Sequence, residues 1–595
     1  MLKNKLSLLA CACAALSVSA GAFDQFGVKS PLPEEAVNTD PQAQVVAFQP
    51  NWLQPVLPET QMQPGEDKFK LQNFATPGEY EPYVFALRSD RTTKLNCEVT
   101  PFTNAAGNVI GAENYQLRVQ RTLYTHNDTA GKKIISPLGL DIAKQVVLKA
   151  NETVAFMLDV KVPQDAKPGM YKATIKFTGA SKNIDLPVVL RVMPFKLIRN
   201  TRSYGSYFLG RYLTDPGRSG YAYSSEAMLE KICKAHHALG FNSAQFCEVT
   251  PRLKYVDGKV VAEFDEIEKI VKAWRAAGNN GLVSLDIRLP GWWCDELSVI
   301  LEKRYTVEPT RYTVEQLENT YPYLNPIEHN LKARWSKDYR LSENAKKFYR
   351  QFLRQLFDLI KKNNWENIYV IVEEESGNGG LKLWGLEQFG PIAAEFPEAK
   401  IMFYDNSPHL GVDLGHKYRE WIQIRQYNFI SPELVATAKA DGRELWYYNR
   451  GWNRAAFGFP VWKLGANGVH MWADQWFDVA PYGSGQPRYP VWSVFYPSPN
   501  GPLPTLEGIR AREGIDDLGY LDTLLDRISK LEAAGKKEAT ARARKQLEQL
   551  KNKLPLTNPE FNAYRQQMTV ENAFAERWKL AAEIIRLDKE LNNAK

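Results

Sequence analysis

Hydrophobic and polar residues alternate along short segments between about residues 67 and 196. Alternation with a period of two is typical of strands with one buried face, and the Gly, Asn and Pro residues between the segments mark turns. The clearest segments are Tyr83–Leu87, Lys94–Val99, Tyr115–Arg121, Thr153–Val160, Gly169–Phe177 and Ile184–Val192. Their number and spacing predict a β-sandwich, to which we assign residues 23–200.

From about residue 201 the pattern changes, because apolar runs of strand length now alternate with segments of helical period. The clearest helix covers Glu343–Asn363, and apolar strands fall near positions 204, 243, 282, 368, 400, 422, 444 and 468. Strands that alternate with helices form parallel sheets. Eight such units within residues 201–505 favour a (β/α)8 barrel over an open doubly wound sheet.

The last segment, residues 506–595, is rich in Lys, Glu, Ala, Leu and Arg and has helical periodicity, with breaks near Pro555 and Pro559. A charged run here is most simply a solvated helix face. The sequence therefore predicts a multidomain protein with an N-terminal all-β sandwich, an α/β (β/α)8 barrel and a C-terminal α-helical extension.

The first 22 residues have the three parts of a secretory signal peptide: Lys3 and Lys5, an apolar run over Leu6–Val18, and a small-residue end at Ala20–Ala22. We expect export to the periplasm or secretion. An outer-membrane lipoprotein acylated at Cys11 is the alternative, although the apolar stretch before Cys11 is very short. No later stretch has the ~20 apolar residues that span a bilayer, so no membrane span is expected.

Composition narrows the functional class. The 595-residue chain has 44% hydrophobic and 24% charged residues, which is the composition of a globular protein. Its net charge is +7, of which Lys3 and Lys5 in the leader contribute two, and it has no long basic run, so we do not expect nucleic acid as a partner. The cysteines after the leader lack CxxC spacing, the seven His residues form no HExxH motif, and no phosphate-binding glycine motif occurs. We expect neither a metal nor a cofactor. Neither cysteine pairing nor oligomeric state follows from the sequence.

Three consecutive carboxylates, Glu373, Glu374 and Glu375, follow directly on the apolar strand Ile368–Val372. Like charges this close raise one another's pKa and cost stability unless a site uses them. In a barrel the carboxyl ends of the strands face the active site, so these groups lie where a substrate would bind. Glu374 and Glu375 point to different sides, so one can serve as an acid while the other stays ionised. The alternative is a solvated acidic turn.

Aromatic and amide side chains also fall near predicted strand ends. Sugar rings pack on aromatic planes while Asn, Asp and Gln bind hydroxyl groups, so such a mixture suits a carbohydrate cleft. Each of these residues could instead fill a core or stabilise its own turn. The candidate substrate-binding residues are Asn242, Trp293, Asp405, Asn406, Gln426, Tyr448, Asn449, Trp472 and Trp476.

Several phrases resemble a known family. The segments 76–88 and 186–195 resemble the first and last strands of an N-terminal sandwich module. Trp446–Asn449, Gly465–Trp472 and Arg512–Asp517 with Tyr520-Leu521 are similar to the second half of glycoside hydrolase family 123 and its uncharacterised relatives. The resemblance covers nearly the whole chain after the leader, and it implies a sandwich, a (β/α)8 barrel and an exo-acting β-N-acetylgalactosaminidase that needs no cofactor.

The resemblance also implies substrate-assisted retention on an oligosaccharide or glycoconjugate. In this mechanism the acetamido oxygen of the substrate attacks the anomeric carbon, an Asp orients the acetamide, and the adjacent Glu protonates the leaving oxygen. By position, Glu374 takes the Asp role and Glu375 the acid role. The extra methylene of Glu374 is a departure from the family pattern. It leaves open a frame of Glu373 and Glu374, or a conventional acid and nucleophile acting on a sugar without an acetamido group.

Two readings from other classes also remain. A non-catalytic glycan-binding protein would keep the barrel without the Asp–Glu pair, and a structural envelope protein would use the sandwich for contacts. The latter leaves the carboxylates and aromatic residues at the strand ends unexplained.

Overall fold

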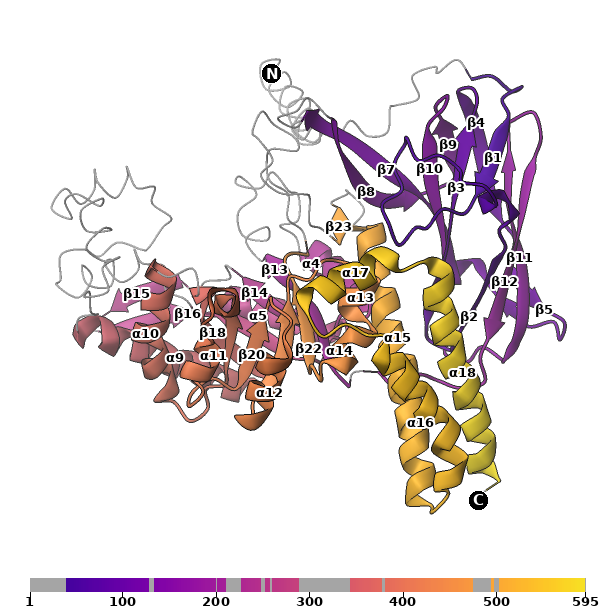
Figure 1. The fold of residues 1–595 in the computed structure, drawn as a ribbon. Helices are drawn as coiled ribbons and strands as arrows, with labels where there is room; N and C mark the ends of the chain where they lie inside the picture. The colour runs from indigo at the N-terminus through magenta and orange to yellow at the C-terminus, as the bar shows by residue number, and fades with distance from the viewer. Residues whose placement is uncertain are drawn as a thin grey trace, which may run out of the picture.

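The computed structural model of the protein describes residues 39–127, 133–199, 201–209, 226–247, 252–256, 259–287, 343–376, 380–474, 494–496 and 502–593. An all-β region, a closed barrel and a group of long helices follow one another along the chain (Figure 1). The predicted leader, including Cys11, lies outside the described residues. Within the described ranges, no helix has the length and apolar character that crossing a membrane requires.

The N-terminal region contains two β-sheets. A five-stranded sheet has the order β1-β3-β10-β7-β8, and a seven-stranded sheet contains β2-β12-β11-β4-β9 with β5 and β6 alongside. The strands are β1 Val45–Phe48, β2 Leu71–Ala75, β3 Tyr80–Ser89, β4 Thr93–Val99, β5 Phe102–Asn104, β6 Val109–Ile110, β7 Tyr115–Asn127, β8 Lys133–Ile142, β9 Gln145–Leu148, β10 Thr153–Lys161, β11 Gly169–Thr178 and β12 Ile184–Val192. All six strands predicted from the alternation are confirmed.

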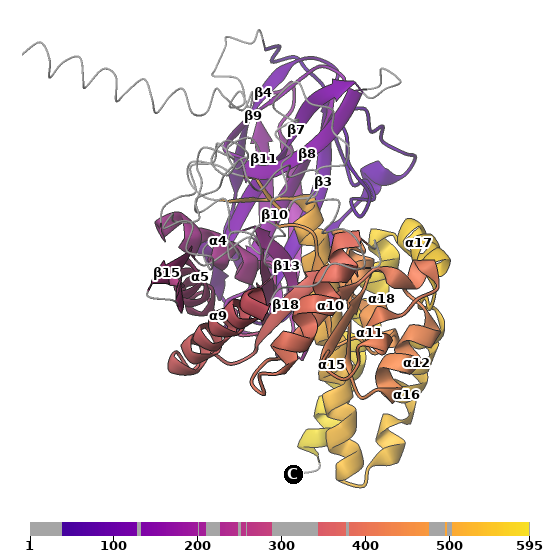
Figure 2. The same cartoon turned by 90° about the vertical axis from the view of Figure 1, so that its left-hand side faces the viewer.

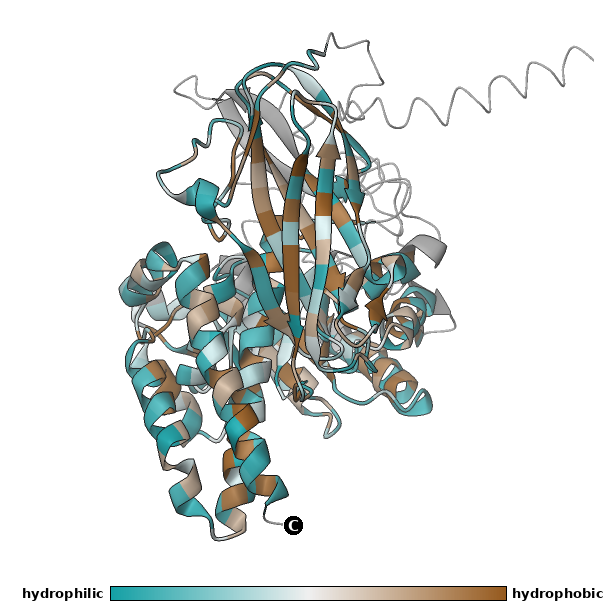
Figure 3. Ribbon diagram, turned by 90° about the vertical axis from the view of Figure 1, so that its right-hand side faces the viewer, coloured by the Kyte–Doolittle hydropathy of each residue, from teal (hydrophilic) through white to brown (hydrophobic). Residues whose placement is uncertain are grey.

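Aromatic residues from both sheets meet in the core between them. Phe85 of β3 stacks on Phe156 of β10 at 5.6 Å between ring centroids, and Phe177 of β11 packs edge-on against both. Buried residues alternate with more exposed ones along β11 and β12, and the ribbon coloured by hydropathy shows hydrophobic and hydrophilic bands in the sandwich (Figure 3). One face of each sheet is thus buried against the other sheet, as expected for a sandwich.

The central region is a closed barrel of eight parallel strands in the order β13-β14-β17-β18-β19-β20-β21-β22. They are β13 Ser203–Leu209, β14 Ser243–Cys247, β17 Val283–Asp286, β18 Ile368–Glu374, β19 Ile401–Asp405, β20 Ile424–Tyr427, β21 Glu444–Tyr448 and β22 Gly468–Met471. Each lies at a position that the sequence predicted. The eight-stranded parallel barrel is therefore confirmed.

Helices surround the barrel (Figure 2). They are α4 Glu226–Ala238, α5 Asp265–Ala276, α9 Glu343–Lys362, α10 Gly380–Ala394, α11 Leu414–Lys417, α12 Pro432–Ala440, α13 Arg454–Phe457 and α14 Phe459–Lys463, with a hairpin of β15 Arg252–Val256 and β16 Lys259–Glu263 before α5. Alternate strand residues, such as Phe208 and Phe246, pack outward on Trp274 of α5. The other set faces the barrel axis. It is unusually polar for a buried surface, since it includes the fully buried residues Ser243, Gln245, Ser284, Gln426 and His470.

The C-terminal helices are α15 Leu506–Ala533, α16 Lys537–Asn552, α17 Asn558–Gln567 and α18 Val570–Asn592. Thr505, Thr557 and Thr569 cap the starts of α15, α17 and α18, because their side chains accept hydrogen bonds from first-turn backbone N–H groups. The helix α15 packs against α18 and α13, so it connects the helical region to the barrel.

Buried charges lie where these three regions meet. Arg577 of α18 contacts Glu513 at 2.9 Å and Asp517 at 2.7 Å on α15, and it lies 3.8 Å from both Glu79 and Glu81 at the start of β3. All five side chains are nearly or completely inaccessible to solvent. We call Glu79, Glu81, Glu513, Asp516, Asp517, Arg199, Arg454 and Arg577 the junction cluster.

Two further arginines complete the junction cluster. Arg454 of α13 donates two hydrogen bonds of 2.7 Å to Asp517, and Arg199, in the linker before β13, pairs with Asp516 at 2.7 Å. Each arginine comes from a different part of the chain than its partner. The junction cluster therefore connects the sandwich, the barrel and the C-terminal helices.

Candidate active site

The three consecutive glutamates end β18, and a β-bulge separates their orientations. The register between β18 and β19 shifts between Ile371 and Glu374, and Glu374 lies opposite Tyr404, a residue that faces the barrel axis. The carboxylate of Glu373 lies against Gly385 of α10 on the outer side, where an added Cβ would come within 2.6 Å of it. The bulge thus directs Glu374 toward the mouth of the barrel and Glu373 away from it.

Glu375 follows the strand in a backbone conformation that side chains rarely adopt. Its φ is 51°, in the left-handed region, and its backbone N–H donates to the carbonyl oxygen of Tyr404 at 2.8 Å. The hydroxyl group of Tyr448 reaches the Glu375 carboxylate at 3.4 Å. Backbone strain of this kind costs about 1–3 kcal/mol and is found most often at functional sites. Here it places a second carboxylate beside Glu374 at the carboxyl end of the strand.

Tyrosine rings line the barrel below these carboxylates. Tyr404 packs at 5.1 Å from Tyr207 and edge-on to Tyr448 at 5.2 Å between ring centroids. Burial, and then the nearby Glu375 and Glu374, raise the pKa of Tyr448 well above its usual range. Burial also raises the pKa of Tyr207, with a smaller contribution from Tyr404 and Glu374. The phenols therefore remain neutral hydrogen-bond donors near the two carboxylates.

Trp472 and Asn449 belong to the same end of the barrel. The backbone N–H of Trp472 donates to Oδ1 of Asn449 at 2.9 Å, and that of Asn449 donates to the carbonyl oxygen of His470 at 3.2 Å. The half-buried Trp472 ring packs edge-on to Tyr207 at 5.2 Å. Tyr448, Asn449 and Trp472 are thus brought together with the glutamates, as their positions after predicted strands suggested.

Gln426 also faces the interior of the barrel. It lies between Tyr404 and Trp446 in the register of the sheet, is fully buried, and donates to the carbonyl oxygen of Tyr447 at 3.3 Å. Its position is below the mouth of the barrel, at the level of the Tyr404 ring. The structure therefore places it in the wall under the site.

Asp405 and Asn406 follow β19, but Asp405 points away from the barrel axis. Its carboxylate accepts hydrogen bonds from the backbone N–H groups of Ser407 and Gly415, both at 2.8 Å, and from the Ser407 hydroxyl. Burial raises its pKa to about 6. Asn406 is buried at the start of the short 3-10 helix Ser407–Leu410. Asp405 thus stabilises its own loop, which is the alternative role that its sequence context left open.

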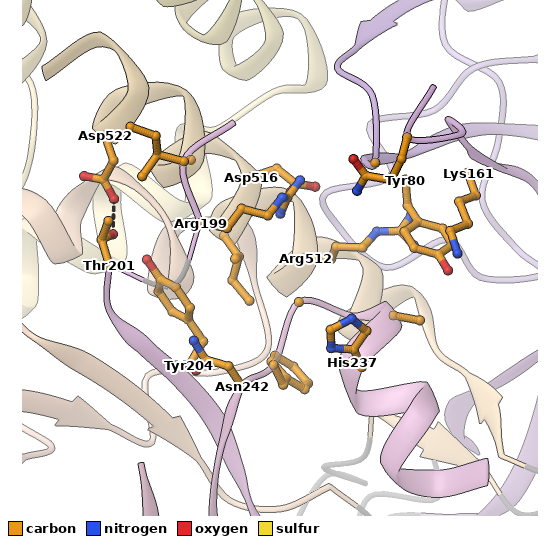
Figure 4. Close-up of a pocket in the computed structure, with 18 residues that line it drawn as sticks. Tyr80, Lys161, Arg199, Thr201, Tyr204, His237, Asn242, Arg512, Asp516 and Asp522 are labelled. Atoms are coloured by element: carbon orange, nitrogen blue, oxygen red, sulfur yellow. Dashed lines mark hydrogen bonds and ion pairs between the residues drawn. The ribbon is translucent and has the colours of Figure 1, made fainter. Parts of the chain in front are cut away.

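Asn242 lies at the opposite end of the barrel from the glutamates, which corrects its assignment as a residue after a strand. It precedes β14, its Oδ1 accepts from the backbone N–H of Tyr204 at 2.9 Å, and its amide donates to the carbonyl oxygen of Arg202 at 3.0 Å. Asn242 lines a cavity of about 260 Å³ between the sandwich, the amino ends of the barrel strands and α15 (Figure 4). The misassignment arose because a polar residue before a strand and one after it look alike in sequence.

Two of the predicted substrate-binding residues, Trp293 and Trp476, lie outside the described residues. In the described ranges, no three His, Cys, Asp or Glu residues are grouped so that they could hold a metal ion, and Cys97 and Cys233 are free thiols. Sequence reasoning missed Tyr207 and Tyr404, because both lie inside apolar runs that read as core strands. Only their inward position in the closed barrel shows that they border the site.

Comparisons with known proteins give a similar fold and no related sequence. No model of a known protein family and no curated protein sequence matches the chain. The structure is similar to that of a family 123 glycoside hydrolase from Clostridium perfringens, which acts in glycolipid glycan hydrolysis. The TM-score is 0.59 and the identity 11%, over 93% of this chain and 98% of that one. This likeness, at such low identity, shows a common fold.

An endo-β-1,4-mannanase from Thermotoga petrophila also matches, with 12% identity over 54% of this chain and 77% of that one. Its TM-score of 0.31 is too low to indicate a common overall fold. The fold and the site together thus define a sandwich-and-barrel protein with a pair of glutamates at the mouth of the barrel.

Proposed function

We propose that the protein is a retaining glycoside hydrolase, with Glu375 as general acid and base and Glu374 as its partner. The observation that carries the proposal is the placement of two adjacent carboxylates at the carboxyl end of β18, above a wall of tyrosines. Active sites of (β/α)8 barrels lie at this end of the strands. The overall fold shared with a family 123 glycoside hydrolase supports the same class of reaction.

In the proposed first step, Glu375 transfers its proton to the glycosidic oxygen while the bond from that oxygen to the anomeric carbon breaks. The acetamido oxygen of the substrate forms the new bond to the anomeric carbon, and Glu374 accepts a hydrogen bond from the acetamide N–H. A water molecule then attacks the anomeric carbon and gives a proton to Glu375, while the bond from that carbon to the acetamido oxygen breaks and the acetamide is restored. The two inversions leave the configuration retained.

The substrate we propose is an oligosaccharide or glycoconjugate that ends in a β-linked N-acetylhexosamine. The Trp472 ring, half-buried at the mouth, offers an apolar plane to a sugar face, and the Tyr448 hydroxyl offers a neutral donor. A conventional pair, with Glu374 as nucleophile, is the second candidate. It is favoured by the longer side chain of Glu374, because a carboxylate displaced toward the anomeric carbon could form a bond with it.

Aryl β-glycosides distinguish these two mechanisms. If the acetamide is the nucleophile, the enzyme releases the aryl group from N-acetylgalactosaminide or N-acetylglucosaminide and not from galactoside or glucoside. Fluorination of the acetyl group makes the acetamide oxygen less nucleophilic, so kcat should fall with each added fluorine. Release from galactoside or glucoside alone, or a kcat indifferent to fluorination, would identify the conventional pair instead.

Glu374→Asp sharpens the assignment of Glu374. Shortening the side chain moves the carboxylate by about an ångström, and a displacement of that size can change a rate by about 100-fold. A rise in kcat on N-acetylhexosaminides would show that the acetamide-orienting role belongs to this position. A fall to the level of Glu374→Gln would show that the site is built for the longer side chain.

A further inference from the structure

A line of hydrogen-bonded side chains crosses the interior of the barrel beneath the two glutamates. His470 of β22 stands in its middle, with Nε2 2.7 Å from the hydroxyl of Ser243 on β14 and Nδ1 2.9 Å from the hydroxyl of Tyr404 on β19. All three side chains are fully buried. They join strands that lie on different sides of the barrel.

The packing around His470 fixes its ring. Trp446 lies edge-on to it at 5.0 Å between ring centroids, and Gly205 approaches so closely that an added Cβ would lie 1.9 Å from the carbonyl oxygen of Ser243 and 3.2 Å from the imidazole. Because Gly205 has no side chain, the Ser243 backbone and the edge of the His470 ring can pack directly against it. Since the ring is held on both sides, the direction of its two nitrogens is set by the fold.

The imidazole is neutral at physiological pH, because burial lowers the pKa of His470 to about 3. A neutral imidazole has one N–H donor and one acceptor nitrogen. The hydroxyl groups of Ser243 and Tyr404 can each donate or accept, so both contacts are satisfied at once. The Tyr404 hydroxyl is thereby held in one direction, toward the barrel axis.

Tyr404 is the residue through which this line reaches the carboxylates. Its carbonyl oxygen accepts the backbone N–H of Glu375 at 2.8 Å, and it is the register partner of Glu374. Its ring packs edge-on against Tyr448, whose hydroxyl reaches Glu375 at 3.4 Å. A displacement of Tyr404 would therefore move both the backbone and the side-chain partner of Glu375.

We propose that His470 is a positioning residue for the reaction, which with Ser243 fixes Tyr404 and through Tyr404 sets the place of Glu375 and Tyr448. This inference rests on the proposed function. Both ring nitrogens of His470 are engaged by the hydroxyl groups of Ser243 and Tyr404, so its effect on the carboxylates passes through Tyr404. The role is distinct from that of a core histidine, which would contribute to stability alone.

His236 on α4 provides a matched control. It too is a fully buried histidine with two hydrogen-bonding partners, since its Nδ1 lies 2.9 Å from the carbonyl oxygen of Ile232 and its Nε2 3.2 Å from the Ser206 hydroxyl. Burial lowers its pKa to about 4. It lies on the face of α4 that packs against the outer side of β13, and its Nε2 is 3.6 Å from the buried carboxylate of Asp474. A comparison of His470→Phe with His236→Phe thus separates positioning from stability.

The expected result is a loss of kcat of about 100-fold in His470→Phe, with KM changed less than about threefold, because misplacement by an ångström costs on this scale. His236→Phe should lower Tm by about as much as His470→Phe does, and it should keep kcat within about threefold of the wild-type value. His470→Asn, whose side-chain amide can replace Nδ1 toward Tyr404, should recover part of the lost kcat. Equal effects of the two Phe variants on kcat, or a fully active His470→Phe, would overturn the inference.

A second measurement does not depend on activity and covers the case in which His470→Phe fails to fold. In wild-type protein labelled with ¹⁵N-histidine, His470 should remain neutral between pH 5 and 8, and Tyr404→Phe should shift its Nδ1 resonance. Titration of His470 near pH 6.5, or an Nδ1 resonance that is unchanged in Tyr404→Phe, would contradict the inference. Failure of the proposed function can be told apart from failure of this inference. In that case Glu375→Gln stays active, or no glycoside is turned over, while the His470 resonances behave as expected.

Discussion

Two groups of acidic residues in this molecule lie in different surroundings. At the mouth of the barrel, Glu374 and Glu375 are half-buried and lie near the phenols of Tyr207 and Tyr448. In the junction cluster, five carboxylates are buried among arginines that bind them directly. Arginine pairing makes the carboxylates of the junction cluster structural, whereas the phenols near Glu374 and Glu375 suit the proton transfer that we propose for them.

The junction cluster also contains more acids than arginines. Five carboxylates face Arg199, Arg454 and Arg577, while Arg512 pairs with Asp159 beside them. Burial, and then the nearby Asp516, raise the pKa of Glu79 to about 7, and burial and Glu513 raise the pKa of Glu81 well above its usual range. Part of the excess negative charge is therefore neutralised by bound protons.

The largest effect on stability should come from Arg577, which contacts four carboxylates of the junction cluster. Arg577→Met leaves Glu513 buried without its nearest arginine and takes from Asp517 one of its two arginine partners, and such a loss costs about 3–5 kcal/mol. Denaturant unfolding should report this change. If the variant unfolds at the wild-type midpoint, the junction cluster does not hold the three regions together.

The pH dependence of stability should depend on Glu79. Its pKa is about 7 in the folded protein and 4.5 ordinarily, so between these values the folded state binds more protons than the unfolded state. Its stabilising contribution is therefore complete below pH 4.5 and is lost as the pH rises through 7. Relative to Glu79→Gln, the wild type should lose on the order of 3 kcal/mol over this range. Parallel pH profiles of unfolding free energy would contradict this account.

At the mouth of the barrel, Tyr448→Phe removes the hydroxyl that reaches Glu375. One such hydrogen bond is worth about 1 kcal/mol, so kcat should fall about fivefold while Tm changes little. Steady-state kinetics on an aryl glycoside and a thermal melt measure the two effects. A variant that loses Tm and keeps kcat would place Tyr448 with the structural residues.

The smallest effect on catalysis should come from Asn242, at the other end of the barrel. Asn242→Ala removes two hydrogen bonds to the start of β13 and should cost about 1–2 kcal/mol of stability. It should leave kcat and KM within about twofold of wild type. A selective rise in KM would return Asn242 to the substrate site.

The sequence predicted the fold more completely than the site. Apolar strand runs such as Ile368–Val372 and Ile401–Phe403 are visible without knowledge of their partners, and their number was enough to predict the barrel. The orientation of Glu373 was not predictable, because a β-bulge breaks the alternation that assigns side chains to faces. The burial of His470 among Ser243 and Tyr404 depends on strands far apart in the chain.

The sequence segments singled out by resemblance lie in two different parts of the structure. Arg512–Asp517 and the segment around Glu79 were singled out for their resemblance to a family of enzymes, and in the structure they build the junction cluster. Gly465–Trp472, by contrast, supplies His470 and Trp472 near the mouth of the barrel. A segment singled out by its resemblance can therefore be structural, and its chemistry follows only from its neighbours in space.

The most direct test of the central claim compares Glu375→Gln with Glu373→Gln on an aryl N-acetyl-β-galactosaminide. The two positions are two residues apart and undergo the same chemical change, but Glu373 lies against α10. Loss of a general acid costs about 10²–10⁴-fold in rate. We expect that loss in Glu375→Gln alone, with Glu373→Gln near the wild-type rate and both variants folded. Equal rates in the two variants, or a wild-type protein that binds the sugar and never cleaves it, would contradict the account.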